Sequence, residues 1–419
     1  MIRSRHWSFW ACACLGAVTL TVPVQAAWIM TEIPNLPGWV GDTEMTGINE
    51  SGEVCGMGNY VVNTSSTPFR FDGTTVTELP FLPGADAPIA LTTGINAAGV
   101  ICGYSHNATG DSRACYWVGT TIYTIPYPPD ANPDADLRVY DINDAGVMVG
   151  YCWNTAVQRT AFYYKDGVSY SLDAAIQTSG LTGGQQSASA VNNNNVICGS
   201  ADDAMGIASA YTYDIDTGVL TVLGQIGFAD NSATSINESG RTIGRGKYYS
   251  FDQYYGVVTH YVTWDFVDPA PTASQWPGGL NDHNRVVGSS YVTGGGRWGW
   301  YSDGPPYGGV IRLDPPGWGS AYFEGINNSD WIVGFGDAPA AGDETRGFII
   351  KPPPGDADHD GDIDLADYDE FADCASGPAE GGGFVPPSEA CLRAFDFASP
   401  DGDVDLDDFA AFQGTFEGS

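Results

Sequence analysis

Basic residues are scarce in this sequence. Its 419 residues include 16 Lys and Arg against 51 Asp and Glu, which gives a formal net charge of −35. Proteins that bind nucleic acid or anionic membrane surfaces need patches of Lys and Arg. We therefore expect neither kind of partner, and such acidity favours solubility and cation binding instead.

Sequence motifs of the common enzyme classes are also missing. The chain has no Gly-x-Ser-x-Gly elbow, His-Glu-x-x-His pair, phosphate loop or dinucleotide fingerprint, and only five His. We assign no catalytic residue. A carbohydrate-active enzyme stays open as an alternative, because the separation of its paired carboxylates is spatial and leaves no sequence signature.

Long apolar runs are limited to one, from about Phe9 to Val24. Arg3 and Arg5 precede it and Val24-Gln25-Ala26 follows it, which is typical of a secretory signal peptide rather than a membrane span. We expect cleavage after Ala26 or Ala27, and a secreted or cell-surface protein without a membrane span. Losing two positive charges would change the net charge from −35 to −37.

One short phrase recurs along the chain. It reads Gly-Ile-Asn-x-x-Gly at residues 47–52 and 94–99, and related copies surround five further Asn residues, namely Asn143, Asn192, Asn237, Asn281 and Asn327. Subtracting the residue numbers, starting from Asn49, gives spacings of 47, 47, 49, 45, 44 and 46. Such a period indicates a repeat architecture.

Each repeat contains four short strand-like segments. In the second repeat these are Ala90–Asn96, Val100–Ser105, Arg113–Val118 and Thr121–Pro126, which alternate in polarity and are rich in β-branched and aromatic residues. Four strands in about 46 residues predict an all-β fold, a seven-bladed β-propeller. The seventh repeat lacks a fourth strand, so we expect the N-terminal segment Trp28–Pro34 to complete it and close the ring.

The repeated residues have plain structural interpretations. Asn followed by Gly is typical of a tight hairpin turn, since Asn bonds its own backbone and Gly accepts positive φ. Aromatic pairs two apart in the third strands, such as Phe69 and Phe71, predict packing between sheets rather than a sugar platform. One repeat position alternates between thiol and Val or Ile, which favours buried apolar thiols over metal ligands at Cys55, Cys102 and Cys198, whereas Cys115 and Cys152 are left undecided.

These phrases resemble the extracellular HAF-repeat family, whose His-Ala-Phe phrase follows an Ile-Asn-x-x-Gly-x-Val-x-Gly phrase. The resemblance covers residues 28–351; Ala161-Phe162 keeps two letters of the second phrase and His260 keeps one. It implies an exported repeat domain and carries no catalytic residues.

A Pro-rich linker, residues 352–355, precedes a very acidic tail. Residues 355–419 hold 18 acidic residues, 14 Asp and 4 Glu, against the single basic Arg393. The segment Asp356–Asp367 follows the EF-hand calcium loop, with Gly361 at the sixth position and Asp at the twelfth. The predicted calcium ligands of this first loop are Asp356, Asp358, Asp360, Asp362 through its carbonyl, Asp364 through water, and Asp367.

A second, less regular loop ends at Asp408. Counting back from Gly402 places Phe397 first, so Asp396 fits only with one extra residue in the loop. Its predicted calcium ligands are Asp396, Ser399, Asp401, Asp403 and Asp408. Cys374 and Cys391 flank an insertion between the two loops, and in an exported protein we expect a disulfide between them.

Two such loops, each followed by a short helix, resemble type I dockerin modules, in which Asp is usual at the twelfth position. The resemblance implies calcium-dependent folding and docking onto a cohesin-like or other cell-surface protein. The expected organisation is a signal peptide over 1–26, a seven-repeat propeller over 27–351, the linker, and a small α-helical calcium module over 356–419.

Three functions remain in view. The first is a non-catalytic exported binding or scaffold protein that is attached through its calcium module. The second is a polysaccharide lyase or glycoside hydrolase on a propeller scaffold, and the third is a structural surface or adhesion protein. A cluster of acidic, Arg, Tyr or His side chains at one mouth of the ring would favour the second, with the loops Asp130–Arg138 and Lys247–Gln253 as candidate sources.

Overall fold

The computed structural model describes most of residues 28–356 and scattered positions beyond. The described residues are 28–36, 38–39, 41–59, 66–84, 89–224, 230–247, 254–260, 263–266, 274–292, 295–305, 310–313, 315, 317–339, 344–353, 355–356, 363, 367–368, 371, 374, 391, 395–396, 404, 408–409 and 411–412. Two compact units divide the chain, and one of them is Trp28–Pro352. The other includes Pro353–Ser419.

The larger unit is built from antiparallel sheets that follow the sequence repeat. Six sheets take their four strands in chain order. The first three contain β2 (Thr43–Ile48), β3 (Val54–Gly58), β4 (Thr67–Phe71) and β5 (Val76–Glu78); β6 (Ala90–Ile95), β7 (Ile101–His106), β8 (Ser112–Val118) and β9 (Thr121–Thr124); and β10 (Leu137–Ile142), β11 (Met148–Trp153), β12 (Arg159–Lys165) and β13 (Val168–Ser171). The next three contain β14 (Gln186–Val191), β15 (Val196–Asp202), β16 (Ala208–Asp214) and β17 (Val219–Val222); β18 (Asp230–Ile236), β19 (Thr242–Lys247), β20 (Tyr254–His260) and β21 (Thr263–Phe266); and β22 (Ser274–Leu280), β23 (Val286–Val292), β24 (Gly295–Ser302) and β25 (Ile311–Arg312).

The seventh sheet joins the two ends of this unit. Its strands β26 (Ala321–Ile326), β27 (Ile332–Asp337) and β28 (Thr345–Lys351) are completed by β1 (Ile29–Glu32) from the N-terminal side. Ile29 pairs with Lys351 and Glu32 with Phe348 in antiparallel register. The expected pairing of the N-terminal strand with the last repeat is therefore confirmed, and the fold is an all-β propeller.

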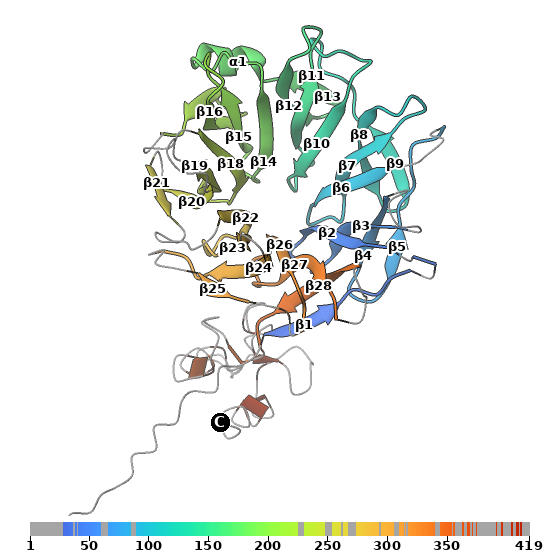
Figure 1. The fold of residues 1–419 in the computed structure, drawn as a ribbon, viewed down its shortest axis with the longest axis vertical. Coiled ribbons are helices and arrows are strands. Elements are labelled where there is room, and N and C mark those ends of the chain that lie inside the picture. Colours follow the sequence, from blue (N-terminus) through green and yellow to red (C-terminus); the bar gives the residue numbers. More distant parts are fainter. Residues whose placement is uncertain are drawn as a thin grey trace, which may run out of the picture. The chain divides into compact units, whose positions relative to one another are not determined.

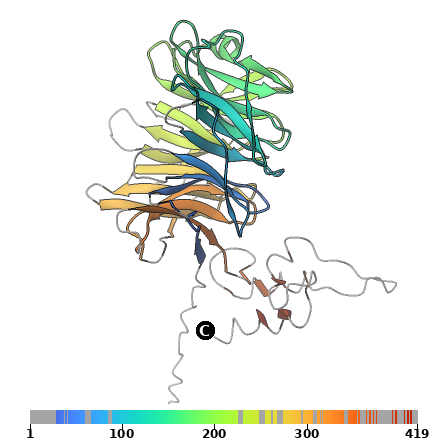
Figure 2. The same ribbon diagram turned by 90° about the vertical axis from the view of Figure 1, so that its right-hand side faces the viewer.

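The sheets form a ring, in which the first strand of each sheet faces the middle (Figure 1; edge-on in Figure 2). Each first strand carries a bulge at the same place, three residues before the repeated Asn, where the pairing with the second strand shifts by one residue. The residues skipped by the pairing are Thr46, Thr93, Tyr140, Ser189, Thr234, Gly278 and Glu324. A bulge bends a strand and redirects its side chains.

The core lies between neighbouring sheets. Third-strand side chains such as Phe69, Trp117 and Phe162 are fully buried, as expected for packing between sheets. The repeat glycine after each Cys, Val or Ile position is needed because strands are crowded there; a Cβ on Gly103 would lie 2.0 Å from the Leu91 carbonyl oxygen.

The thiols of the larger unit are part of this core. Cys55, Cys102 and Cys198 are free and fully buried, which confirms their apolar role, and Cys115 and Cys152 are buried free thiols too. Burial raises the pKa of Cys55 to about 11, so this thiol stays protonated at neutral pH.

One helix was not expected from the sequence. Helix α1 (Asp173–Thr178) lies in the connection between β13 and β14, and its Ile176 is buried beside Leu172 and Leu181. The repeat pattern hides it, because the spacing of 49 residues between Asn143 and Asn192 is the longest of the six and places the helix in added residues.

In the smaller unit, two copies of one pattern share an apolar cluster. Ile363 and Val404, Asp367 and Asp408, and Phe371 and Phe412 are each 41 residues apart by subtraction. The Phe371 and Phe412 rings stack with centroids 5.2 Å apart. The backbone is helical at Asp367–Tyr368, Phe371, Asp408–Phe409 and 411–412, among other described positions.

Cys374 and Cys391 form the expected disulfide, with Cα atoms 5.2 Å apart. Across the described part of the chain, no helix is long and apolar enough to cross a membrane.

Candidate functional site

The repeated Asn side chains lie at one end of the first strands and are 3–5 % exposed. Each Oδ1 accepts backbone N–H groups within its own turn, as in Asn49, which accepts from Ser51 at 3.1 Å and Glu53 at 2.9 Å. Each Nδ2 donates to the main-chain oxygen of the Asn in the next repeat. These seven bonds run 49→96 (3.0 Å), 96→143 (3.2 Å), 143→192 (2.9 Å), 192→237 (2.9 Å), 237→281 (3.1 Å), 281→327 (3.1 Å) and 327→49 (3.1 Å).

A second set of bonds joins the repeats at the same end. The N–H of the residue after the Asn donates to the side chain of the equivalent residue in the next repeat, as in Ala97 to Asp144 at 2.8 Å and Glu238 to Asp282 at 2.8 Å. The acidic side chains of Asp144 and Asp282 at this end therefore stabilise the contacts between repeats. The sequence predicted the local turn bonds, whereas the bonds between repeats, which join residues 44–49 apart along the chain, were missed.

Aromatic and guanidinium groups gather at the other end of the first strands. In one cluster, the Arg138 guanidinium lies 4.6 Å from the Tyr104 ring centroid, and that of Arg159 lies 3.9 Å from Tyr151. Arg159 also donates to the Tyr140 hydroxyl at 3.3 Å. Burial raises the pKa of Tyr140 to about 12, so its hydroxyl stays protonated and can donate.

A second cluster surrounds a cavity of about 220 Å³, which we call the arginine pocket. It is lined by Thr234, Arg245, Trp276, Pro277, Gly278, Ser289, Arg297, Phe323 and Glu324. The Arg245 guanidinium lies 4.4 Å from the Trp276 ring centroid, and that of Arg297 lies 5.5 Å from it. Arg297 is also 4.8 Å from the Tyr322 ring.

Glu324 is the acidic residue of the arginine pocket. Its side chain is solvent-exposed where it lines the pocket. Desolvation of its carboxyl by the neighbouring strands, together with the charge of Glu44, raises the pKa of Glu324 to about 7 against the opposing attraction of Arg297. Burial and the charge of Asp42 also raise the pKa of Glu44. A carboxyl group that titrates near neutrality can donate or accept a proton.

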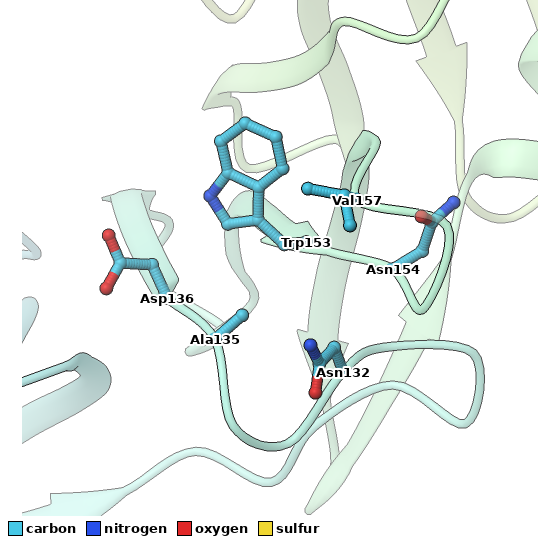
Figure 3. A pocket seen from close by; sticks show the side chains of 6 residues that line it. All are labelled: Asn132, Ala135, Asp136, Trp153, Asn154 and Val157. Atoms are coloured by element: carbon cyan, nitrogen blue, oxygen red, sulfur yellow. The ribbon is translucent and has the colours of Figure 1, made fainter. Parts of the chain in front are cut away.

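A separate groove of about 230 Å³ involves the predicted loop Asp130–Arg138 (Figure 3). Figure 3 shows the Trp153 ring between the side chains of Asp136 and Val157. The Asp136 carboxylate stabilises the fold: it accepts a hydrogen bond from the Ser112 N–H at 2.8 Å and forms an ion pair with Arg138 at 3.1 Å. The groove therefore offers an apolar surface without a converging acid–base pair.

Arg138 from the first predicted loop joins an aromatic cluster, and residues 248–253 of the second loop lie outside the described residues. The members of the arginine pocket were missed because they come from repeats that differ at equivalent positions. At the position three residues before the repeated Asn, five repeats have a hydroxyl side chain, the sixth has Gly278 and the seventh has Glu324. The single charged residue at this position is the sequence feature from which the pocket could have been predicted.

The predicted calcium residues are only partly described. Asp356, Asp367 and Asp408 are 0–2 % exposed, and Asp396 is half-buried. The others lie outside the described residues, namely Asp358, Asp360, Asp362, Asp364, Ser399, Asp401 and Asp403. Among the residues that the structure does describe, no three His, Cys, Asp or Glu side chains gather to hold a metal ion.

The burial of these carboxylates nevertheless fits a cation site. Asp367 and Asp408 occupy the twelfth position of the two predicted loops and are buried equally deeply, at 0 % and 2 % exposure. An ionised carboxylate is costly to bury unless it is paired or bound to a metal. Asp356 at the first loop position is buried to the same degree, at 2 % exposure.

No family model and no curated protein matches the chain. Among solved structures, the β-propeller domain of the Trilobed protease from Pyrococcus furiosus is 9% identical with a TM-score of 0.49, covering 74% of this chain and 95% of that chain. TolB from Acinetobacter baumannii is 13% identical with a TM-score of 0.42, covering 68% of each chain. A prolyl endopeptidase is 9% identical with a TM-score of 0.48, covering 75% of this chain and 51% of its own. At these identities the similarity concerns the β-propeller fold alone.

Proposed function

We propose that the protein is an exported, non-catalytic binding protein. Its propeller presents a recognition face at the arginine pocket, and the module from Asp356 onward attaches it to a partner. The observation that carries this proposal is the uneven use of the two ends of the ring. The Asn end is occupied by hydrogen bonds between repeats, whereas aromatic and guanidinium groups surround a cavity of about 220 Å³ at the other.

We also propose that the seven sheets are the blades of a seven-bladed propeller. The unbroken circle of Asn bonds supports this count, since it passes through every repeat and returns to Asn49. The pairing of β1 with β28 supports it as well. A closed ring leaves only short outer-strand edges and holds the pocket residues from different repeats in fixed positions.

For the tail, we propose a dockerin-like module with calcium in the first loop and in the more divergent second loop. The buried Asp367 and Asp408 support it, as does their 41-residue offset, shared by the apolar pairs around Phe371 and Phe412. Calcium would be bound by oxygens of these carboxylates. A cohesin-like or other cell-surface protein is the partner that the resemblance suggests, and secretion is the matching location.

A carbohydrate-active enzyme is the second candidate. It is favoured by Glu324 and Glu44, two carboxyls with raised pKa values, of which Glu44 acts electrostatically on Glu324. Glycoside hydrolases use two carboxyls with different pKa values. Hydrolysis that stops in a Glu324→Gln variant with an unchanged thermal midpoint would make this the better assignment.

The test is retention and cleavage of a panel of polysaccharides by the full-length protein. We expect at least one polysaccharide to be retained without cleavage, and Arg297→Gln to weaken its retention. The matched control is Arg312→Gln, because Arg312 lies 5.4 Å from the Trp298 ring but does not line the arginine pocket. Equal loss in both variants would contradict a site at this pocket.

A further inference from the structure

We propose that the arginine pocket binds the carboxylate of an acidic sugar, so that the ligand is a uronate-containing polysaccharide. This inference rests on the proposed binding function and names its ligand class.

The shape of the pocket follows from one residue. At the bulge position of the first strands, Thr234, Gly278 and Glu324 come from three successive repeats and all line the cavity. Gly278 lets the backbones of the sixth and seventh repeats approach closely beside the cavity, since a Cβ there would lie 2.1 Å from the Phe323 carbonyl oxygen. The pocket is thus built into the sixth repeat.

The size of the pocket limits the ligand. Its volume of about 220 Å³ lies below the roughly 300 Å³ at which pockets for drug-sized ligands begin. One sugar ring is therefore the suitable occupant, with the rest of a chain outside. The Trp276 ring adds apolar surface beside the two guanidinium groups, and the Thr234 hydroxyl, which donates to the Ile243 carbonyl, can accept from a sugar hydroxyl.

The charge of the pocket selects an anion. The whole chain has only 16 Lys and Arg, yet two Arg residues lie on the same Trp276 ring. The Arg297 guanidinium is surrounded by aromatic rings, with Tyr291 at 5.9 Å and Tyr322 at 4.8 Å. Among the described residues it has no hydrogen-bonded or ion-paired acceptor, although the Glu324 charge acts on it from within the pocket.

A planar carboxylate matches this guanidinium. Arg offers N–H donors in a fixed fork that binds a carboxylate through two parallel bonds, and its charge persists in a poorly hydrated site. The acidic surface of the rest of the protein repels polyanions at long range. Recognition would therefore depend on direct contacts with Arg297 and Arg245, and not on long-range electrostatic attraction to the protein as a whole.

The test uses the full-length protein, a trigalacturonate oligomer and its methyl ester, which carries the same sugars without charge. We expect the acid to bind and the ester to bind at least tenfold more weakly, as measured by calorimetry. Arg297→Gln should weaken binding of the acid tenfold or more, and Arg297→Lys, which keeps the charge but loses the fork, should lie between. Arg312→Gln is expected to bind as the wild type does.

The outcomes separate this inference from the broader proposal. Equal binding of acid and ester, or an unchanged affinity in a folded Arg297→Gln variant, overturns the uronate assignment. If a neutral polysaccharide is instead retained and lost in Trp276→Phe, the binding function stands and the uronate ligand falls. If dextran sulfate binds more tightly than the trigalacturonate through Arg297, the ligand is a sulfate ester and this inference is wrong. Retention of no polysaccharide at all removes both proposals.

Discussion

The side-chain amide of Asn327 donates a 3.1 Å hydrogen bond to the main-chain oxygen of Asn49, a residue 278 positions earlier in the chain. This bond closes the circle of seven Asn bonds between the repeats. Because the Oδ1 of the same side chain accepts from Ser329 and Trp331, both at 3.0 Å, one buried amide fixes a turn and a junction between sheets.

Replacing Asn327 by Asp tests the junction separately from the turn. The carboxylate keeps the acceptor for the turn but loses the donor to Asn49 and buries a charge, so we expect a loss of about 2–4 kcal/mol in the free energy of unfolding. Denaturant unfolding measures it.

The control for that variant is Asn107→Asp. Asn107 makes the same turn bonds, to the N–H groups of Thr109 at 3.0 Å and Asp111 at 2.9 Å, in an outer hairpin. This variant should lose less than about 1 kcal/mol in the free energy of unfolding, because Asn107 makes no bond to another repeat within the described part of the chain. Similar losses in the two variants would mean that the bonds between repeats contribute little.

Much of the fold could be predicted from the repeat. The period predicted the sheets, and strand ends agree within two residues, as in the expected Thr121–Pro126 against β9 at Thr121–Thr124. Hairpin turns and buried thiols depend on local chemistry or on one repeat position, and both are visible in the sequence. The arginine pocket is different, because Arg245, Trp276 and Glu324 are exceptions in three repeats at three different positions and only the closed ring brings them together.

Asp141 gives a prediction for the pH dependence of stability. It occupies a position that holds Gly, Ala or Ser in the other repeats, and burial raises its pKa from 3.8 to about 7, although it accepts from the Val191 N–H at 2.9 Å. A raised pKa in the folded state means that folding binds a proton. This carboxyl therefore makes the folded protein less stable as the pH rises from about 4 to 7.

An Asp141→Asn variant should lose that contribution and keep the acceptor for Val191. We compare the free energy of unfolding of the variant with that of the wild type at each pH. This difference should be about 1–2 kcal/mol more favourable to the variant at pH 8 than at pH 4, after allowance for solvent screening. Denaturant unfolding of both proteins at the two pH values gives the comparison. A difference between them that does not change with pH would show that this carboxyl has an ordinary pKa.

Calcium binding by the smaller unit can be tested at Asp367. We expect millimolar calcium to release heat and to raise the thermal midpoint of this unit in the full-length protein, since the ion would compensate the buried carboxylates. Asp367→Asn should weaken binding at the first loop by tenfold or more. Asp134→Asn, at an exposed loop position in the larger unit, removes the same charge and should leave calcium binding unchanged. Absence of both heat and a thermal shift in the wild type would rule out the calcium site.

The raised pKa of Glu324 predicts that binding of a uronate depends on pH. The charged groups that line the pocket with it or act on it are Arg297, Arg245 and Glu44, and the titratable Tyr322 ring lies 4.8 Å from the Arg297 guanidinium. Below its pKa of about 7 the carboxyl is protonated and can donate to the ligand, whereas above this value it is ionised and repels the ligand carboxylate.

We therefore expect the affinity for trigalacturonate to fall about fivefold, or about 1 kcal/mol, between pH 5.5 and 8. Glu324→Gln should bind with nearly the same affinity at both values, because the amide is neutral throughout. Glu44→Gln is the control, since Glu44 raises the pKa of Glu324 without lining the pocket; it should move the pH at which affinity falls to a lower value while keeping the fall itself. A pH dependence that persists unchanged in Glu324→Gln would assign the titration to another group and place the ligand away from this carboxyl.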